Sequence, residues 1–175
     1  MMQRPNPTEH APFYAGYIAL IDDAGPIAAL EAQRRAIHRL ATLSEDEAGH
    51  RYAEGKWSVK ELLGHVADTE RVFAYRLLRI ARADATPLAG FDENLWAASA
   101  PHHGRPMAKV VHDLLAVREA TLSLVDSLDA ADLDRATEAS GRMVSGRALC
   151  WMLAGHAQHH LAILQARYGL QGFDL

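Results

Sequence analysis

Apolar residues recur at intervals of three and four along most of the chain, and no run shows strict alternation of apolar and polar residues. The first pattern is typical of one buried face of an α-helix, whereas strict alternation would indicate a half-buried strand. The pattern predicts helices over 26–43, 58–83, 106–128 and 145–168, and one or two helical turns over 130–138. We therefore expect an all-α, four-helix bundle.

Several of the predicted helix ends carry residues that favour the start or stop of a helix. Pro26 suits a first helical turn, where no backbone N–H is needed. Ser58 and Glu61 have the spacing of a capping box, and Ser145 can cap the last helix. Gly169 is placed to end that helix. Local chemistry thus supports the boundaries that the periodicity indicates.

Two stretches lie outside the helical pattern. Three prolines within the first dozen residues predict an extended N-terminal segment over 1–24. The connection 84–106 exceeds 20 residues, which is long for a bare loop, so it is expected to hold a short helix or to serve the function. The chain has no repeat and no linker long enough for a second domain, which predicts one domain over 1–175.

Composition narrows the class of protein. The 175 residues carry 49% hydrophobic and 23% charged residues and a net charge of −4, which fits one soluble globular domain. No dense Lys/Arg run is present, so a nucleic acid partner is not expected. The single cysteine, Cys150, excludes an intramolecular disulfide framework, and we expect it to be a buried hydrophobic residue rather than a nucleophile. No basic segment precedes an apolar one at the N-terminus, which predicts a cytoplasmic protein.

One uncharged run of 19 residues, 148–166, approaches the length of a membrane span. Its second half carries three histidines and two glutamines, which makes it too polar for contact with lipid. The run is therefore expected to be a buried helix whose interior face includes imidazoles, and no membrane partner is expected.

Three of the ten histidines have the spacing of a shared metal site. His156 and His160 are four residues apart on one predicted helix, so their Cβ atoms lie about 6 Å apart, as in H-x-x-x-H metal sites. His65 lies in an apolar stretch and joins them if its helix is a neighbour. His159 is not excluded by periodicity alone. Three neutral imidazoles with an open position form a catalytic type of site, suited to zinc, nickel, copper or iron.

The other reading of these histidines is that they are hydrogen-bonded core residues, which is the commoner role of a histidine on an apolar face. The remaining six are expected at the surface. Four lie in polar surroundings: His10, His38, His50 and His112. His102 and His103 lie in the long connection, where an exposed pair is favoured over a loop ligand.

The segment GKWSVKELLGHVADTERVFAYR, followed by AGHAQHHLAIL, resembles the DinB-like (DinB/YfiT-type) family of metalloenzymes, and the likeness runs from Trp57 to Leu170. The resemblance implies a four-helix bundle with a long crossover connection, often a homodimer. It implies a divalent metal ion, zinc or nickel with iron as a further option, held by three residues: His65, His156 and His160. His159 then stands next to a ligand position rather than on one.

What the resemblance implies about activity is broader. Related families include S-transferases that use bacillithiol, mycothiol or glutathione, a maleylpyruvate isomerase, and proteins labelled as hydrolases. The expected function is thus a metal-dependent S-transferase or hydrolase that acts on a small-molecule substrate, with a low-molecular-weight thiol as one candidate partner. The alternative is a non-catalytic, metal-stabilised helical module that binds a ligand.

Four further side chains are candidates for the chemistry. Asp68 follows His65 by three residues and is the candidate catalytic group, either as a base or by orienting a ligand histidine. The competing interpretation of Asp68 is a solvated helix face. Asp92, Glu93 and Trp96 in the long connection are candidates for the mouth of a pocket.

Overall fold

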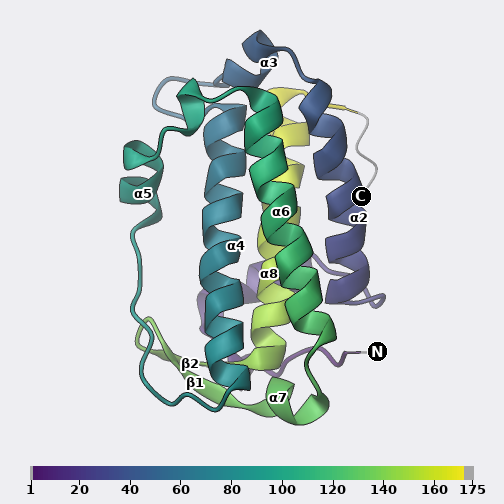
Figure 1. The fold of residues 1–175 in the computed structure, drawn as a ribbon, viewed down its shortest axis with the longest axis vertical. Helices are drawn as coiled ribbons and strands as arrows, with labels where there is room; N and C mark the ends of the chain where they lie inside the picture. Colours follow the sequence, from purple (N-terminus) through teal and green to yellow (C-terminus); the bar gives the residue numbers. More distant parts are fainter. Residues whose placement is uncertain (1, 172–175) are drawn as a thin grey trace.

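The structure is a computed structural model that describes residues 2–171. Four long helices lie side by side as a bundle (Figure 1): α2 (Pro26–Arg39), α4 (Val59–Ala81), α6 (Met107–Asp126) and α8 (Gly146–Tyr168). α4 packs against α6 and α8, and α2 packs against the same two helices, so the four form a closed ring. The predicted all-α four-helix bundle is confirmed, and α4 and α8 are neighbours.

Shorter elements close the two ends and one side of the bundle. The short helices are α1 (Ala15–Ala19), α3 (Glu45–Gly49), α5 (Glu93–Ser99) and α7 (Ala130–Asp134). Single 3₁₀ turns are η1 (Pro7–Glu9), η2 (Pro12–Tyr14), η3 (Leu40–Thr42) and η4 (His102–Gly104). The strands β1 (Ala136–Ala139) and β2 (Arg142–Ser145) form an antiparallel hairpin. In Figure 1 the long connection between α4 and α6, which contains α5 and η4, runs along the outside of α4.

The helix caps form as the sequence predicts. The Ser58 side chain accepts a hydrogen bond from the backbone N–H of Glu61, and the Glu61 carboxylate accepts one in return from the backbone of Ser58. Ser145 caps α8 through the N–H of Ala148. Gly169 ends α8 in the left-handed region, with a φ of 69°.

The N-terminal segment is not extended, which corrects the expectation for 1–24; Met1 lies outside the described residues. It folds into η1, η2 and α1, because a proline can begin a helical turn without losing a hydrogen bond, and Pro7 and Pro12 do so here. The segment is fixed by contacts distant in sequence: the Trp151 indole N–H donates to the Gln3 carbonyl at 3.0 Å. Arg4 donates to the carbonyls of Ile18 and Ile21 at 2.9 and 2.7 Å.

The β-hairpin is the second feature that the sequence pattern does not predict. Each strand has only four residues, too few for alternation to stand out. Its turn, expected at 140–142, places Ser140 and Gly141 at φ values of 53° and 74°. The hairpin also binds the long connection, since the N–H of Leu88 donates to the Glu138 carbonyl and the N–H of Ser140 donates to the Leu88 carbonyl, each at 2.9 Å.

A network of buried polar side chains joins the four long helices. Arg118 on α6 is fully buried and donates two hydrogen bonds of 2.8 Å to the two carboxylate oxygens of Glu70 on α4. It also donates to the Leu30 carbonyl and the Gln33 side chain of α2. Gln33 in turn donates to the Ala154 carbonyl of α8 at 2.9 Å. We call these residues the Arg118 network.

Among residues 2–171, the helices lack the combination of length and apolar character that crossing a membrane requires. The uncharged stretch of α8 instead packs inside the bundle, and nearly all of its side chains from 148 to 157 are buried.

Candidate metal centre

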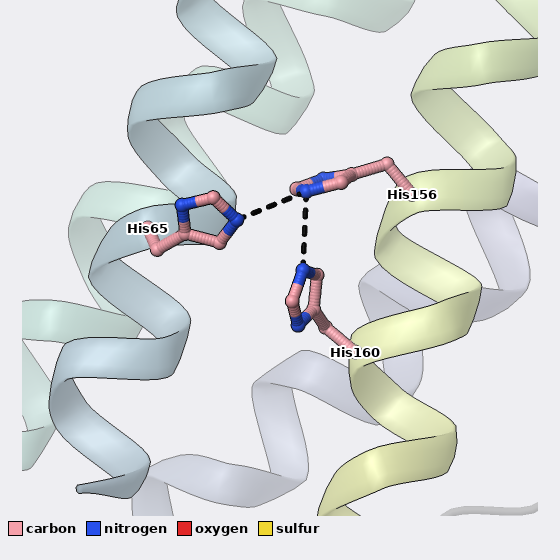
Figure 2. Close-up of side chains that lie close together, drawn as sticks. All are labelled: His65, His156 and His160. Carbon is pink, nitrogen blue, oxygen red and sulfur yellow. Dashed lines mark hydrogen bonds between the residues drawn. The ribbon is translucent and has the colours of Figure 1, made fainter. Parts of the chain in front are cut away.

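The three histidines predicted to share a metal ion lie together between α4 and α8 (Figure 2). The Nε2 atom of His65 lies 3.1 Å from that of His156, and the Nε2 atom of His160 lies 3.1 Å from the same atom. One nitrogen from each ring lies within 4.8 Å of the others, and all three side chains are buried. Within the described residues, the two helices thus bring His65 to the pair on α8 (Figure 2).

Hydrogen bonds between the rings cannot satisfy this arrangement. A neutral imidazole nitrogen carries either one proton or one lone pair, so His156 Nε2 cannot serve both neighbours equally well. A cation among the three rings could instead accept a lone pair from each nitrogen. Two nitrogens bound to a tetrahedral zinc ion at its usual bond length lie about 3.3 Å apart, close to the separations seen here. The donor set and its spacing fit a divalent metal.

Burial keeps these imidazoles neutral at physiological pH, the form that ligates metals. Loss of solvation lowers the pKa of His65 to about 4 and that of His160 to about 3. The pKa of His156 lies well below its usual value, first because of burial and then because of the neighbouring imidazoles. The Nδ1 atom of His160 is buried and has no hydrogen-bond partner in the described part of the chain.

The N-terminal segment forms one wall beside the histidines. A Cβ atom at Gly155 would lie 2.2 Å from the Tyr17 carbonyl oxygen, so a glycine there lets α1 approach α8. The Tyr17 ring then lies with its centroid 5.6 Å from that of His156. On the α4 side, the Trp57 and His65 ring centroids are 4.8 Å apart. Aromatic rings therefore fix the orientation of two of the three imidazoles.

A cavity of about 250 Å³ opens over the three histidines. Its apolar wall is aromatic and includes Tyr17, Trp57, Phe73 and Phe91. Its polar lining includes Thr69, Arg76, Glu93, Asn94 and Ser140. Glu93 is the only carboxylate that lines it within residues 2–171. A ligand in the cavity could therefore reach the Nε2 atoms from the open side.

Asp68, the candidate catalytic group, faces a different part of the molecule. One of its oxygens lies 3.2 Å from the Arg71 guanidinium, and the other lies 3.2 Å from Nε2 of His102. It does not line the cavity, and no hydrogen bond joins it to a site imidazole in the described structure. The structure thus offers no contact by which Asp68 would orient one of the three histidines.

Of the three candidates for the mouth of the pocket, only one lines the cavity. Asp92 caps α5 by accepting from the N–H groups of Asn94 and Leu95, whereas Glu93 lines the cavity. Trp96 lies outside the lining, and its ring packs on Phe91 at a centroid distance of 4.7 Å.

The remaining histidines do not join the cluster. His159 stacks beside Tyr17, with ring centroids 5.1 Å apart, and His38, His50, His103 and His112 are not buried, as expected. His10 and His102 are buried, which corrects their assignment to the surface. His102 packs on α4 where Gly64 leaves room, since a Cβ there would lie 2.3 Å from the imidazole ring.

Sequence reasoning missed several residues of the cavity. Thr69 and Arg76 follow His65 on α4 by four and eleven residues, which places all three on one helix face. This spacing could have identified both residues as neighbours of the site. Tyr14 and Tyr17 come from a segment with no periodic pattern, and only the fold shows their position.

These observations define a helical bundle with a cluster of three neutral imidazoles beneath an open aromatic cavity. The family described as the DinB superfamily matches residues 28–164, and the chain belongs to this family. This confirms the resemblance drawn from the two sequence segments.

Relatives and solved structures agree with this assignment. A protein of Oceanobacillus iheyensis, provisionally named a metal-dependent hydrolase, is 30% identical over 124 residues, which cover 69% of this chain and 70% of the relative. A protein of Bacillus licheniformis with the same description is 30% identical over 140 residues, 77% of each chain.

YfiT from Bacillus subtilis, described as a probable metal-dependent hydrolase with an unusual four-helix bundle topology, matches in fold. Its TM-score is 0.69 at 15% identity, covering 97% of this chain and 95% of YfiT. The DinB-like protein YjoA from Bacillus subtilis has a TM-score of 0.60 at 19% identity, covering 86% and 96%.

Proposed function

We propose that the protein is a hydrolase that depends on a divalent metal ion and acts on a small molecule. The observation that carries the proposal is the convergence of three Nε2 atoms at the floor of an open cavity. Three protein ligands leave a coordination position for water or substrate, which distinguishes catalytic from closed structural sites. The description of two relatives as metal-dependent hydrolases supports the same class.

Each part of the site has a task in this proposal. His65, His156 and His160 would hold the metal ion. A divalent ion there would supply Lewis acidity and lower the pKa of water at the open position. Glu93 accepts the proton of the attacking water and returns it to the leaving group, because it is the carboxylate that lines the cavity. The aromatic wall binds the apolar part of the substrate and excludes bulk water.

The donor set limits the metal. Three imidazoles without a carboxylate suit zinc and nickel, and iron is the third candidate. Mg²⁺ and Ca²⁺ prefer oxygen ligands and are not expected.

Thiol-dependent transfer is the second candidate function. Cys150 is fully buried and its burial raises the pKa of the thiol to about 12, so this thiol cannot be the nucleophile. A reaction of a thiolate would therefore use a low-molecular-weight thiol bound in the cavity. In that case a divalent ion held by the three histidines would supply the charge that favours the thiolate form of that thiol.

The test begins with protein purified without a histidine tag. Metal content is measured, and metal-free protein is reloaded separately with zinc, nickel and iron. Each form is assayed for hydrolysis of nitrophenyl esters and anilides, and for transfer of bacillithiol, mycothiol and glutathione to a model electrophile. Hydrolysis that requires the metal supports the proposal. Thiol transfer without hydrolysis would favour the second candidate, and protein that binds no metal would overturn both.

Two matched variants test the proton acceptor. Glu93→Gln is expected to lower kcat by about 10²–10⁴-fold with unchanged metal content, the usual range for loss of a general base. Asp68→Asn removes the competing carboxylate on α4 and is expected to leave kcat within a few-fold of the wild type. The opposite pattern would assign the role of base to Asp68.

A further inference from the structure

Arg76 on α4 is a buried cation without a counter-charge. Its side chain is 3% exposed, yet no carboxylate in the described chain lies within ion-pair distance. Arg118, the other buried arginine, has both oxygens of Glu70 as partners. Burying a charge is costly unless an opposite charge compensates for it. The missing anion at Arg76 therefore requires an explanation.

The surrounding backbone holds the Arg76 guanidinium in place. One of its nitrogens donates to the Ala89 carbonyl at 2.7 Å and to the Ser140 hydroxyl at 2.9 Å. Ser140 reaches this position with a φ of 53°, in the left-handed region that a residue with a side chain rarely occupies. A two-residue hairpin loop needs a positive φ at both of its residues, so the pairing of Ala139 with Arg142 sets the position of Ser140. The hairpin turn and the long connection thus fix one edge of the guanidinium. The Tyr14 hydroxyl is a further hydrogen-bond partner, and the remaining N–H groups are available to a ligand.

Thr69, between His65 and Arg76 on the same helix, gives an independent observation. Its side chain is 3% exposed, and its hydroxyl has no hydrogen-bond partner in the described structure. The residue lines the cavity over the histidines. An unpaired buried hydroxyl costs free energy that a ligand oxygen would recover.

Arg76 also lies where two cavities meet. A second cavity of about 190 Å³, lined mainly by apolar side chains of β2 and α8, shares Phe13, Tyr14, Arg76 and Ser140 with the first. Arg76 follows His65 by eleven residues, about 16 Å along the helix axis, and a helical side chain leans toward the N-terminal end. A ligand that reaches from the guanidinium to the histidines is then on the order of 10 Å long.

We propose that Arg76 is the binding site for a carboxylate group of the substrate, and that Thr69 donates a hydrogen bond to a second oxygen nearer the histidines. The substrate is then a small carboxylic acid with an apolar or aromatic part and a reactive ester or amide group. A planar guanidinium suits a carboxylate because its remaining N–H groups can donate to both oxygens. This inference rests on the proposed function for the reacting end of the ligand, but binding at Arg76 does not require the metal.

The test uses hippurate, an aromatic amide with one carboxylate, and its neutral counterpart hippuramide as probes of the Arg76 end of the cavity, not as substrates. Their affinities are measured by calorimetry for the metal-loaded and the metal-free protein. Hippurate is expected to bind at least about tenfold more tightly than hippuramide in both forms, as charge-assisted hydrogen bonds are stronger than neutral ones. Arg76→Gln is expected to remove this preference, whereas Arg142→Gln, which changes an exposed arginine of the second cavity, is expected to keep it.

Thr69→Val gives a second readout that does not disturb a hydrogen bond of the folded chain. It is expected to weaken both probes several-fold and to leave the melting temperature unchanged or raised. A preference for hippurate that depends on the metal and survives Arg76→Gln would place the carboxylate on the metal and overturn the inference alone. Protein that never binds metal but shows the Arg76-dependent preference would overturn the proposed function alone.

Discussion

Two groups of buried polar side chains lie in the same bundle, and they differ in whether the protein satisfies them. The Arg118 network pairs its charges and directs its donors to carbonyl or carboxylate oxygens on three other helices. Within residues 2–171, the Nε2 atoms of His65, His156 and His160 have only one another as partners. The first group is complete within the chain, whereas the second needs a ligand to be complete.

A structural polar cluster differs from a binding site in whether its polar groups find partners within the chain. Both clusters are buried, and both connect α4 to other long helices. Burial of polar groups is tolerated when each has a partner, so a complete network contributes to a unique bundle arrangement. A cluster that remains incomplete and opens to a cavity is better explained by what it binds. The following predictions test this difference.

The largest effect on stability is expected from Glu70→Gln, which leaves the buried charge of Arg118 without a partner. Breaking a buried ion pair on one side commonly costs about 3–5 kcal/mol, so the free energy of unfolding in urea should fall by about 3 kcal/mol or more. Glu119→Gln is the matched control, because it breaks an exposed Arg–Glu pair between α2 and α6 with an N–O distance of 2.7 Å. That change should cost about 1 kcal/mol or less. Equal effects of the two variants would contradict the distinction.

The second prediction concerns His156, whose Nε2 lies between the other two. His156→Ala should lower zinc or nickel affinity by more than about 100-fold, since even outer contacts of a metal site are worth 10–100-fold. The metal-free variant should lose about 1–3 kcal/mol of unfolding free energy, because the buried ring packs against Tyr17 and Phe73 and its removal leaves a cavity. His159→Ala, one turn away on the same helix, should retain the metal. Full metal content in His156→Ala would exclude the proposed ligand set.

The third prediction is a pH dependence of the metal-free protein. The folded-state pKa values of His65 and His160 are lowered to about 4 and 3, below the value of about 6.5 in the unfolded chain. Between these values the unfolded state binds more protons, so stability is complete above pH 6.5 and is lost as the pH falls toward 4.

The contribution of one histidine to this pH dependence can be measured by comparing the wild type with a variant that lacks it. Each histidine should contribute up to about 1.4 kcal/mol per pH unit to the slope. Urea unfolding in EDTA from pH 7.5 to 4.5 should show a steeper loss for the wild type than for His160→Gln. Parallel curves would show that the imidazole does not stay neutral in the folded chain.

The long helices were predictable because the spacing of apolar residues within each one marks its buried face. Apolar spacing and the Ser58–Glu61 capping box describe α4 without reference to the rest of the chain. The N-terminal turns and the hairpin depend on distant partners, such as the Trp151 bond to Gln3 and the backbone pairing of Leu88. Helix α3 is a different case, since the Ser44–Glu47 capping box that begins it has a spacing visible in the sequence.

The candidate metal site was also only partly predictable from the sequence. Helical spacing alone pairs His156 with His160, whereas His65 joins them only because α4 and α8 are neighbours. Arg76 and Thr69 share the face of His65, but nothing in the sequence shows that one lacks a carboxylate and the other a hydrogen-bond partner. Whether a polar group is satisfied is a property of the packed chain, which local patterns do not contain.

The smallest effect is expected at Asp68, which belongs to a third polar group on the outer side of α4. Its oxygens contact Arg71 and His102 rather than a site imidazole, and the side chain is partly exposed. Asp68→Asn should therefore change metal affinity by less than tenfold and the free energy of unfolding by about 1 kcal/mol or less, the usual value of exposed ion pairs. Metal competition with a chromophoric chelator measures the first quantity. A loss of 10–100-fold would instead show that Asp68 acts on a ligand histidine through a contact made only when metal is bound, because that is the cost of losing an outer-sphere partner.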